Sequence, residues 1–230
     1  MPTEKEVYAS HADQYELLIL REDYQKNIPR EIREILNPSG LDIVELGAGT
    51  GRLTRDLVKE AKYVYTCDAS HHMLSQANSV LNHQSRSNFL QSIADMRQTP
   101  FLSGCADMVI AGWSFCYLTV WGGDGWQREL DKGIQEAQRL LRQDGVIILL
   151  ENFGTGFESP HPPPHLKGYF EYLELKGFQS TWFRTDYQFN SHEEALTLSN
   201  FFFGSELAEK VAQNKWTILP ECTGILWLKI

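Results

Sequence analysis

The chain has 230 residues, of which 42% are hydrophobic and 22% are charged, and its formal net charge at pH 7 is −9. This length and composition fit one globular domain with a sizeable core, with or without an inserted subdomain. Because the excess charge is negative and no run of lysine and arginine occurs, we expect neither a nucleic-acid partner nor attraction to an anionic membrane.

The first forty residues predict a helical cap. Their apolar side chains are spaced as on one face of a helix, and Pro29 is suited to begin a second helix. Asn37–Gly40 is then a break, because proline and glycine interrupt regular structure. The apolar face of the first helix is formed by Leu17, Leu18, Leu20, Tyr24 and Ile28.

From residue 41 onward, short apolar segments alternate with helical patterns. Such alternation is typical of a parallel sheet with helices on both faces. Ser70 is a candidate N-cap for one of these helices, and Asp144-Gly145 are expected to end the helix before the fifth strand. The predicted strands are Ile43–Leu46, Val64–Cys67, Phe89–Ile93, Met108–Gly112 and Val146–Leu150.

The last third of the chain has a different pattern. We expect a helix that contains Phe170 and Leu173, then a strand near Trp182–Phe189 and a final strand at Ile225–Ile230. Between those strands, Ser191 is suited to cap a helix that runs to Phe203, and residues 191–215 predict a helical insertion. Aromatic side chains are frequent here, which predicts core packing together with an apolar pocket or a homodimer surface.

The four cysteines, Cys67, Cys105, Cys116 and Cys222, form no CxxC pair and no disulfide framework. Metal-ligand spacing is also absent, so we expect no metal. The first ten residues are polar and lack the apolar core of a signal peptide, and no apolar stretch approaches the length of a membrane span. The sequence therefore predicts a cytoplasmic protein with no membrane partner.

The most informative segment is Asp42–Thr54, a short apolar strand that leads into a glycine-rich turn and a helix. The glycines at 47, 49 and 51 permit backbone angles that other residues resist, and they allow a ligand to approach the main chain. The second predicted strand ends in Asp68. A glycine turn combined with such an acidic residue is how a Rossmann-like sheet binds a nucleoside.

The segment Glu45–Gly51 resembles the first motif of class I S-adenosylmethionine-dependent methyltransferases, and the resemblance covers about Leu41–Asn152. It implies S-adenosylmethionine as the cofactor. It also implies a Rossmann-like α/β fold of about seven strands, mostly parallel with an antiparallel C-terminal hairpin, with helices on both faces and an N-terminal helical cap. We expect one domain: a cap over 1–40, a cofactor-binding half over 41–152 and a substrate-side half over 153–230.

The resemblance assigns roles at the methionine and ribose end of the cofactor. It implies that Glu45 holds the amino end, and that Asp68 binds both ribose hydroxyls, with Ala69 following it. A carboxylate suits the ribose because it accepts two hydrogen bonds at once. The residues implied under the methionine part are Gly47, Ala48, Gly49 and Gly51.

At the adenine end, the resemblance implies an apolar contact from Met73 and an acceptor for the adenine amino group at Asp95, with the backbone of Met96 beside it. Gly112 and Trp113 are implied to lie beside the transferred methyl group. An aromatic face there would suit the positive charge of a sulfonium.

The nearest rival is a nicotinamide or flavin dehydrogenase, which requires the pattern GxGxxG. Arg52 stands where that pattern requires its third glycine. An arginine at this position obstructs the close packing of helix and strand around a pyrophosphate, and we therefore favour the methyl donor.

The methyl acceptor is less well defined. Methyl transfer from a sulfonium depends mainly on alignment and requires a base only when the acceptor arrives protonated, so no catalytic residue is identified. Gly112–Phe115 lacks the Asn/Asp-Pro-Pro-aromatic motif of exocyclic-amine methyltransferases, and no cysteine follows a proline as cytosine-C5 enzymes require. Candidate substrate-pocket residues, each of which also has an ordinary structural reading, are His11, Tyr15, Tyr117, Glu151 and Asn152.

The main hypothesis is a methyltransferase that acts on a small-molecule acceptor. A regulatory module that binds the cofactor without turnover and a protein methyltransferase remain alternatives. A closed pocket roofed by the N-terminal helices and residues 191–215 would favour a small acceptor, whereas an open groove would favour a protein.

Overall fold

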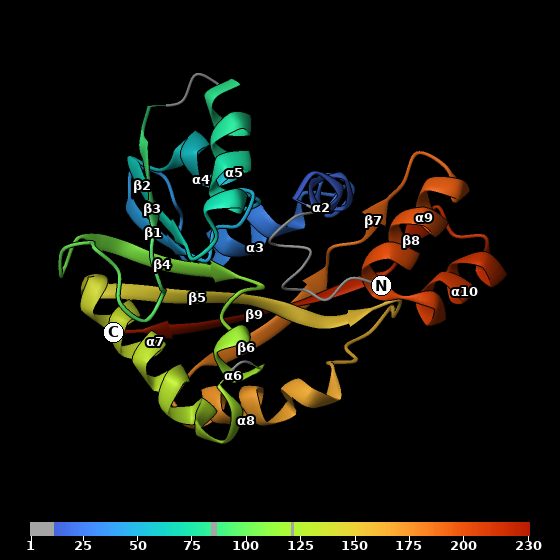
Figure 1. The fold of residues 1–230 in the computed structure, drawn as a ribbon. Coiled ribbons are helices and arrows are strands. Elements are labelled where there is room, and N and C mark those ends of the chain that lie inside the picture. The colour runs from blue at the N-terminus through green and yellow to red at the C-terminus, as the bar shows by residue number, and fades with distance from the viewer. Residues whose placement is uncertain (1–11, 84–86, 121) are drawn as a thin grey trace.

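A seven-stranded sheet forms the centre of the computed structural model, which describes residues 12–83, 87–120 and 122–230 (Figure 1). Its strands lie in the order β3-β2-β1-β4-β5-β9-β6. The seven strands are β1 Asp42–Leu46, β2 Tyr63–Asp68, β3 Phe89–Ile93, β4 Ala106–Gly112, β5 Leu141–Thr155, β6 Gln179–Arg184 and β9 Glu221–Lys229.

Strands β1 to β5 are parallel, whereas β9 is antiparallel to both of its neighbours, β5 and β6. The chain adds β2 and β3 on one side of β1 and then returns to place β4 on the other side. The predicted seven-stranded Rossmann-like fold with an antiparallel C-terminal pair is confirmed. Such a reversal of strand order opens a crevice at the carboxyl ends of β1 and β4, where open α/β sheets bind ligands.

Helices cover both faces of the sheet, and a small second sheet of β7 and β8 lies apart from it (Figure 1). The remaining elements of the described residues are α2 Ala12–Ile19, α3 Asn27–Ile35, α4 Thr54–Glu60, α5 His71–His83, α6 Tyr117–Val120, η1 Gly123–Gly125, α7 Trp126–Leu140, η2 Pro164–Leu166, α8 Lys167–Leu175, β7 Tyr187–Gln188, α9 His192–Phe203, α10 Ser205–Asn214 and β8 Ile218–Leu219.

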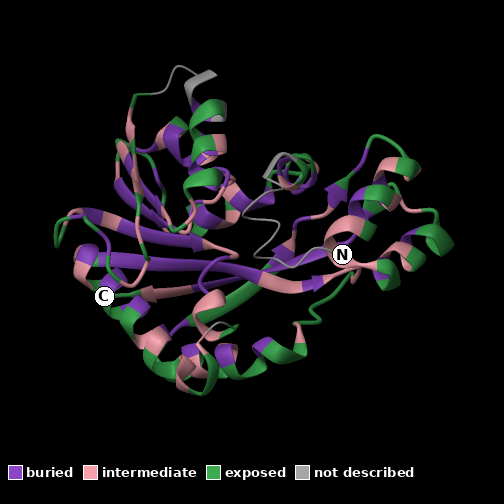
Figure 2. Cartoon of the chain, viewed as in Figure 1, coloured by how far each residue is buried: buried purple, intermediate pink, exposed green. Residues whose placement is uncertain are grey.

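Successive residues of the central strands contribute to two different core layers, because side chains alternate between the faces of a sheet. Val44 and Leu46 of β1 pack with α7 and α8, whereas Ile43 packs with α3 and α4. All five residues of β1 are buried, as expected for a strand covered on both faces (Figure 2). The continuous apolar strands of the sequence therefore position the sheet between two helical layers.

A third apolar cluster joins α9, α10, β7 and β8 to Leu18 of α2. The hydroxyl of Ser191 accepts a hydrogen bond from the backbone N–H of Glu194, 3.1 Å away, and so caps α9 as predicted. Gly204, at φ +85°, separates α9 from α10. These helices lie beyond the carboxyl end of β5, where Gly156 abuts Leu207 of α10 (Figure 1).

The structure corrects the predicted apolar face of the first helix. Helix α2 ends at Ile19, so Tyr24 and Ile28 do not belong to it. Instead the chain turns at Asp23, whose carboxylate accepts hydrogen bonds from the first two backbone N–H groups of α3, those of Asn27 and Ile28, at 2.8 and 2.9 Å. The orphan donors at a helix N-terminus require such partners.

Two further boundaries differ from the prediction. Asp144-Gly145 do not end the preceding helix, which stops at Leu140; they lie within β5, where the pairing with β4 shifts register and Asp144 has φ +64°. The strand expected near Trp182–Phe189 is divided into β6 and β7. Thr185 lies at the break, and its hydroxyl is 2.6 Å from that of Thr223.

We expect Ile148→Ala to lower the free energy of unfolding by about 2–5 kcal/mol, because it leaves a cavity in a close-packed strand. Ile148 is fully buried in β5 between Ile110 of β4 and Trp227 of β9. Denaturant unfolding measures the change. The control Leu175→Ala, at a side chain that is 83% exposed, should alter stability by less than about 0.5 kcal/mol. Equal effects of the two variants would contradict this core assignment.

Candidate functional site

A cavity of about 800 Å³ opens at the carboxyl ends of the parallel strands. Its volume falls within the range of small-molecule and cofactor sites. Of the twelve residues predicted to bind the cofactor, eleven line the cavity; the exception is Gly51, which faces Ala77 of α5. The lining residues from this set are Glu45, Gly47, Ala48, Gly49, Asp68, Ala69, Met73, Asp95, Met96, Gly112 and Trp113.

Gly47 forms the floor of the cavity where β1 ends. It has φ +71°, and a Cβ atom there would lie 2.5 Å from the side chain of Ser114, so no other residue fits without a shift. The Ser114 hydroxyl in turn donates a hydrogen bond to the carbonyl of Leu46, at 3.0 Å. The glycine thus lets the loop after β4 pack directly on the turn after β1.

Asp68, at the end of β2, is fixed by the backbone around it. Its Oδ2 accepts a hydrogen bond from the Gly49 N–H at 2.9 Å, and its Oδ1 accepts one from the Ser70 N–H at 2.8 Å. Burial raises the pKa of this carboxyl, and the two backbone hydrogen bonds partly oppose the rise. Each oxygen keeps a second lone pair, so the carboxylate is oriented and still able to accept from two hydroxyls.

Glu45 lies deeper, and its side chain is 2% exposed. Its Oε2 accepts a hydrogen bond from the Thr54 hydroxyl at 2.5 Å. Burial raises the pKa of Glu45 to about 8, so this carboxyl is mostly protonated near neutral pH. A cation brought next to it would favour the ionised form and lower that pKa again.

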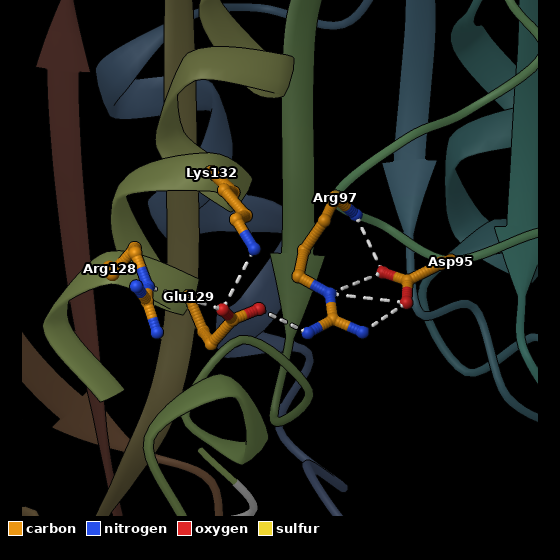
Figure 3. Close-up of polar contacts among 5 residues, drawn as sticks. All are labelled: Asp95, Arg97, Arg128, Glu129 and Lys132. Carbon is orange, nitrogen blue, oxygen red and sulfur yellow. Dashed lines mark hydrogen bonds and ion pairs between the residues drawn. The ribbon is translucent and has the colours of Figure 1, made fainter. Parts of the chain in front are cut away.

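The edge of the cavity next to β3 carries a chain of charges (Figure 3). The guanidinium of Arg97 forms an ion pair with Asp95 on one side and, through Nη1, contacts Oε2 of Glu129 on α7 at 2.5 Å. Lys132, one turn further along α7, donates to the other oxygen of Glu129 at 2.8 Å. Asp95, Arg97 and Glu129 all line the cavity.

Arg52 and Trp113 form a wall near the end of β4. The guanidinium carbon of Arg52 lies 3.1 Å from the centroid of the Trp113 ring, and the same side chain forms a buried ion pair with Glu22. Trp113 has φ +50°, an uncommon backbone conformation for a bulky residue. One face of the ring is therefore already covered by a cation, and only the rest of the indole remains for a ligand.

The predicted substrate-pocket residues separate into three groups. Tyr15 of α2 and Tyr117 of α6 line the cavity, whereas His11 lies outside the described residues. Glu151 and Asn152 do not line it. The Glu151 carboxylate accepts hydrogen bonds from the Cys116 N–H at 3.1 Å and the Tyr169 hydroxyl at 2.7 Å.

Asn152 likewise makes local contacts within β5. Its Nδ2 donates to the Thr155 hydroxyl at 2.9 Å, and its Oδ1 accepts from the Gly154 N–H at 2.6 Å. Glu151 therefore ties the loop after β4 to α8, and Asn152 shapes the end of β5. Neither side chain reaches the cavity, although both lie near the carboxyl end of β5.

Sequence reasoning missed several residues of the cavity wall. Arg52 was considered only as an obstacle to dinucleotide binding, and Arg97 and Glu129 carried no recognisable signal, because their meeting depends on how α7 packs beside β4. Thr50 was also missed; the residue lines the cavity, and its buried hydroxyl has no hydrogen-bond partner among the described residues. The other missed lining residues are Leu53, Ser70, Ala94, Leu118 and Gly122.

The described ranges contain neither a cluster of metal ligands nor a helix that could span a membrane. No three histidine, cysteine, aspartate or glutamate side chains in these ranges lie close enough together to hold a metal ion. No helix in them is both long and apolar enough to cross a bilayer.

Residues 44–149 match the family of methyltransferase domains. Over 115 residues the chain is 27% identical to phosphoethanolamine N-methyltransferase 1 of Zea mays, an alignment that covers 49% of this chain and 21% of the maize protein. The chain thus spans about a fifth of the length of that relative.

Two solved structures have similar folds. A SAM-dependent methyltransferase from Aquifex aeolicus superposes with a TM-score of 0.58 at 14% identity, over 88% of this chain and 89% of the other. Phosphoethanolamine N-methyltransferase 1 of Haemonchus contortus, in complex with phosphoethanolamine and S-adenosylhomocysteine, gives 0.54 at 18% identity, over 96% of this chain and 48% of the other. At such identities the likeness concerns the fold.

We expect Glu151→Gln to alter the pH dependence of stability. Burial raises the pKa of Glu151 from about 4.5 to about 7 in the folded state, so the wild type loses stability as pH rises through that range. Glutamine does not titrate and keeps an acceptor oxygen for Cys116 and Tyr169. From about pH 5 to about pH 8, the Tm of the variant relative to the wild type should therefore rise by roughly 5–10 °C.

Thermal unfolding across this pH range measures the effect. The control Glu171→Gln removes an exposed carboxyl of α8 and should leave the difference in Tm independent of pH. A constant offset between Glu151→Gln and the wild type would contradict the assignment of a raised pKa to Glu151.

Proposed function

We propose that the chain is a class I S-adenosylmethionine-dependent methyltransferase, as the match of residues 44–149 to the methyltransferase domain family supports, and that it transfers a methyl group from that cofactor to a small-molecule acceptor. The observation that carries this proposal is the single cavity that brings eleven predicted cofactor residues together with Tyr15 and Tyr117. One ligand space beside both sets of residues is what a two-substrate transfer requires.

The residues around the cavity fit S-adenosylmethionine. Asp68 is oriented by two backbone N–H groups and retains acceptor capacity for two ribose hydroxyls. The turn at Gly47 and Gly49 offers main chain without side chains to the methionine part. We assign Glu45 to the amino end, where ionisation of its buried carboxyl would be favoured by the ammonium group.

When bound, the cofactor supplies a methyl group on a sulfonium, which is already electrophilic. The protein is left with binding, orientation and exclusion of water. Gly112, Trp113 and Ser114 follow β4 at the centre of the crevice, and we assign this loop to the region of the transferred methyl. The stacked Arg52 restricts the movement of the Trp113 ring and so fixes one wall of the acceptor space.

A small acceptor is supported by the size and surroundings of the cavity. Tyr15 brings α2 to its wall, and the Tyr15 ring packs edge-on against Phe202 of α9 at 6.0 Å between centroids. Residues 192–214 themselves do not line the cavity, so α9 supports the roof from behind. Both phosphoethanolamine methyltransferases are named for a small acceptor. A cytoplasmic location and a homodimer stay predictions.

Incubation of the protein with a labelled methyl donor and a fractionated metabolite extract tests turnover. Label in a small-molecule product supports the proposal. Label recovered only in added protein would favour a protein methyltransferase, and cofactor binding without labelled product would favour a regulatory module.

We expect Asp68→Ala to weaken the binding of S-adenosylhomocysteine by about 10- to 100-fold, because it removes charge-assisted hydrogen bonds to the ribose and also releases the turn at Gly49. Titration calorimetry measures the dissociation constant. The control Asp56→Ala removes a carboxylate on α4 that pairs with Lys59, and it should leave the affinity unchanged. An Asp68→Ala protein that is folded and binds as the wild type does would refute this ribose site.

A further inference from the structure

Arg97 makes an unusually complete set of contacts with Asp95 (Figure 3). Its backbone N–H and its Nε donate to Oδ1 of Asp95 at 2.8 and 2.9 Å. Nε also approaches Oδ2 at 3.1 Å, and Nη2 forms an ion pair with the same oxygen. An ionised carboxylate has about four lone-pair positions. Three N–H groups of Arg97 converge on them, with the single Nε hydrogen shared between the two oxygens, so Arg97 alone takes up most of the acceptor capacity of Asp95.

The place of Asp95 in the sheet makes that occupation relevant to the cofactor. In the pairing of β2 with β3, Asp68 is opposite Ile93, and Asp95 follows two residues later. A nucleoside whose ribose is bound by Asp68 therefore has its base beside the end of β3. Ala94, Asp95, Met96 and Arg97 all line the cavity there.

Arg97 has a second carboxylate within reach. Its Nη1 already contacts Oε2 of Glu129, while Lys132 binds the other oxygen of Glu129. Arg97 and Asp95 are both partly exposed, and their side chains are 37% and 45% accessible. Because ion pairs at such positions contribute little net stability, a modest competing interaction is enough to separate them.

We propose that Arg97 competes with the adenine amino group of the cofactor for Asp95. When adenine displaces the guanidinium of Arg97 from Asp95, Glu129 retains the guanidinium. This inference rests on the proposed function, because it takes the cofactor site as given. Methyl donor and demethylated product carry the same adenosine, so the competition weakens both to the same extent. Its consequence is faster release of the product, a step that limits many enzymes.

Removing the charged side chain of Arg97 should strengthen the binding of S-adenosylhomocysteine. We expect Arg97→Met to bind S-adenosylhomocysteine about threefold more tightly than the wild type at low ionic strength, a change of the size that exposed ion pairs allow. The advantage should shrink at about 0.5 M salt, where such pairs are screened. S-adenosylhomocysteine suits the test because it carries no sulfonium charge, so loss of a nearby cation has little long-range effect on it.

Titration calorimetry on folded full-length variants measures the affinities. The matched control Lys132→Met removes a cation that contacts Glu129 and acts on Asp95 only through its charge. The affinity of this variant should lie within about twofold of the wild type, since exposed charges contribute little. In an Asp95→Ala background the gain from Arg97→Met should disappear, because nothing remains to compete for.

Weaker or unchanged binding by Arg97→Met would overturn the inference, because it would make Arg97 a cofactor contact or a bystander. A gain of equal size in the Asp95→Ala background would overturn it as well. Failure of the folded wild type to bind S-adenosylhomocysteine is a separate result, which would remove the proposed function and this inference with it.

Discussion

The contact between Gly47 and Ser114 is the constraint on which the site depends. Strands β1 and β4 are neighbours in the sheet, yet the chain leaves them in different directions, and their ends can meet closely only if one of them carries no side chain. Glycine at φ +71° satisfies both the close approach and the backbone angle. The hydrogen bond from Ser114 to Leu46 then closes the junction and leaves a crevice above it.

Near that junction, three carboxyl side chains have different surroundings, which give them different properties. Asp68 accepts two backbone hydrogen bonds, which orient it and offset part of the cost of burial. Glu45 has a hydroxyl donor and a pKa raised to about 8, so its charge depends on what binds beside it. Glu151, outside the cavity, uses its oxygen to connect the loop after β4 with α8. The properties of each carboxyl group therefore depend on the partners that surround it.

Much of the fold, and eleven of the residues that line the cavity, could be predicted from the sequence, because both depend on local patterns. Apolar strands, alternating helices and a glycine turn can each be recognised from a short segment of sequence, and Asp68 lies at the end of the second strand. The bulge at Asp144 and the turn at Asp23 could not be predicted, since they are set by register with β4 and by capping of α3.

The acceptor side was harder to predict for the same reason. Glu151 follows the central part of β5 as a ligand-binding residue would, but its orientation is decided by Tyr169, eighteen residues away on α8. Arg97 and Glu129 are ordinary charged residues in the sequence, and only the packing of α7 beside β4 and β5 brings Glu129 to the segment after β3 (Figure 3). Side chains that meet through tertiary packing leave no short motif to recognise.

We propose that one cofactor occupies the crevice at the carboxyl ends of β1, β2, β3 and β4. Amide hydrogen exchange with and without S-adenosylhomocysteine tests it most directly, because bound ligand protects the backbone that it covers. We predict slower exchange at residues 47–51, 68–73 and 94–97, with no change at the exposed loop 158–165. Protection confined to other segments, or none at a saturating concentration of ligand, would contradict the account.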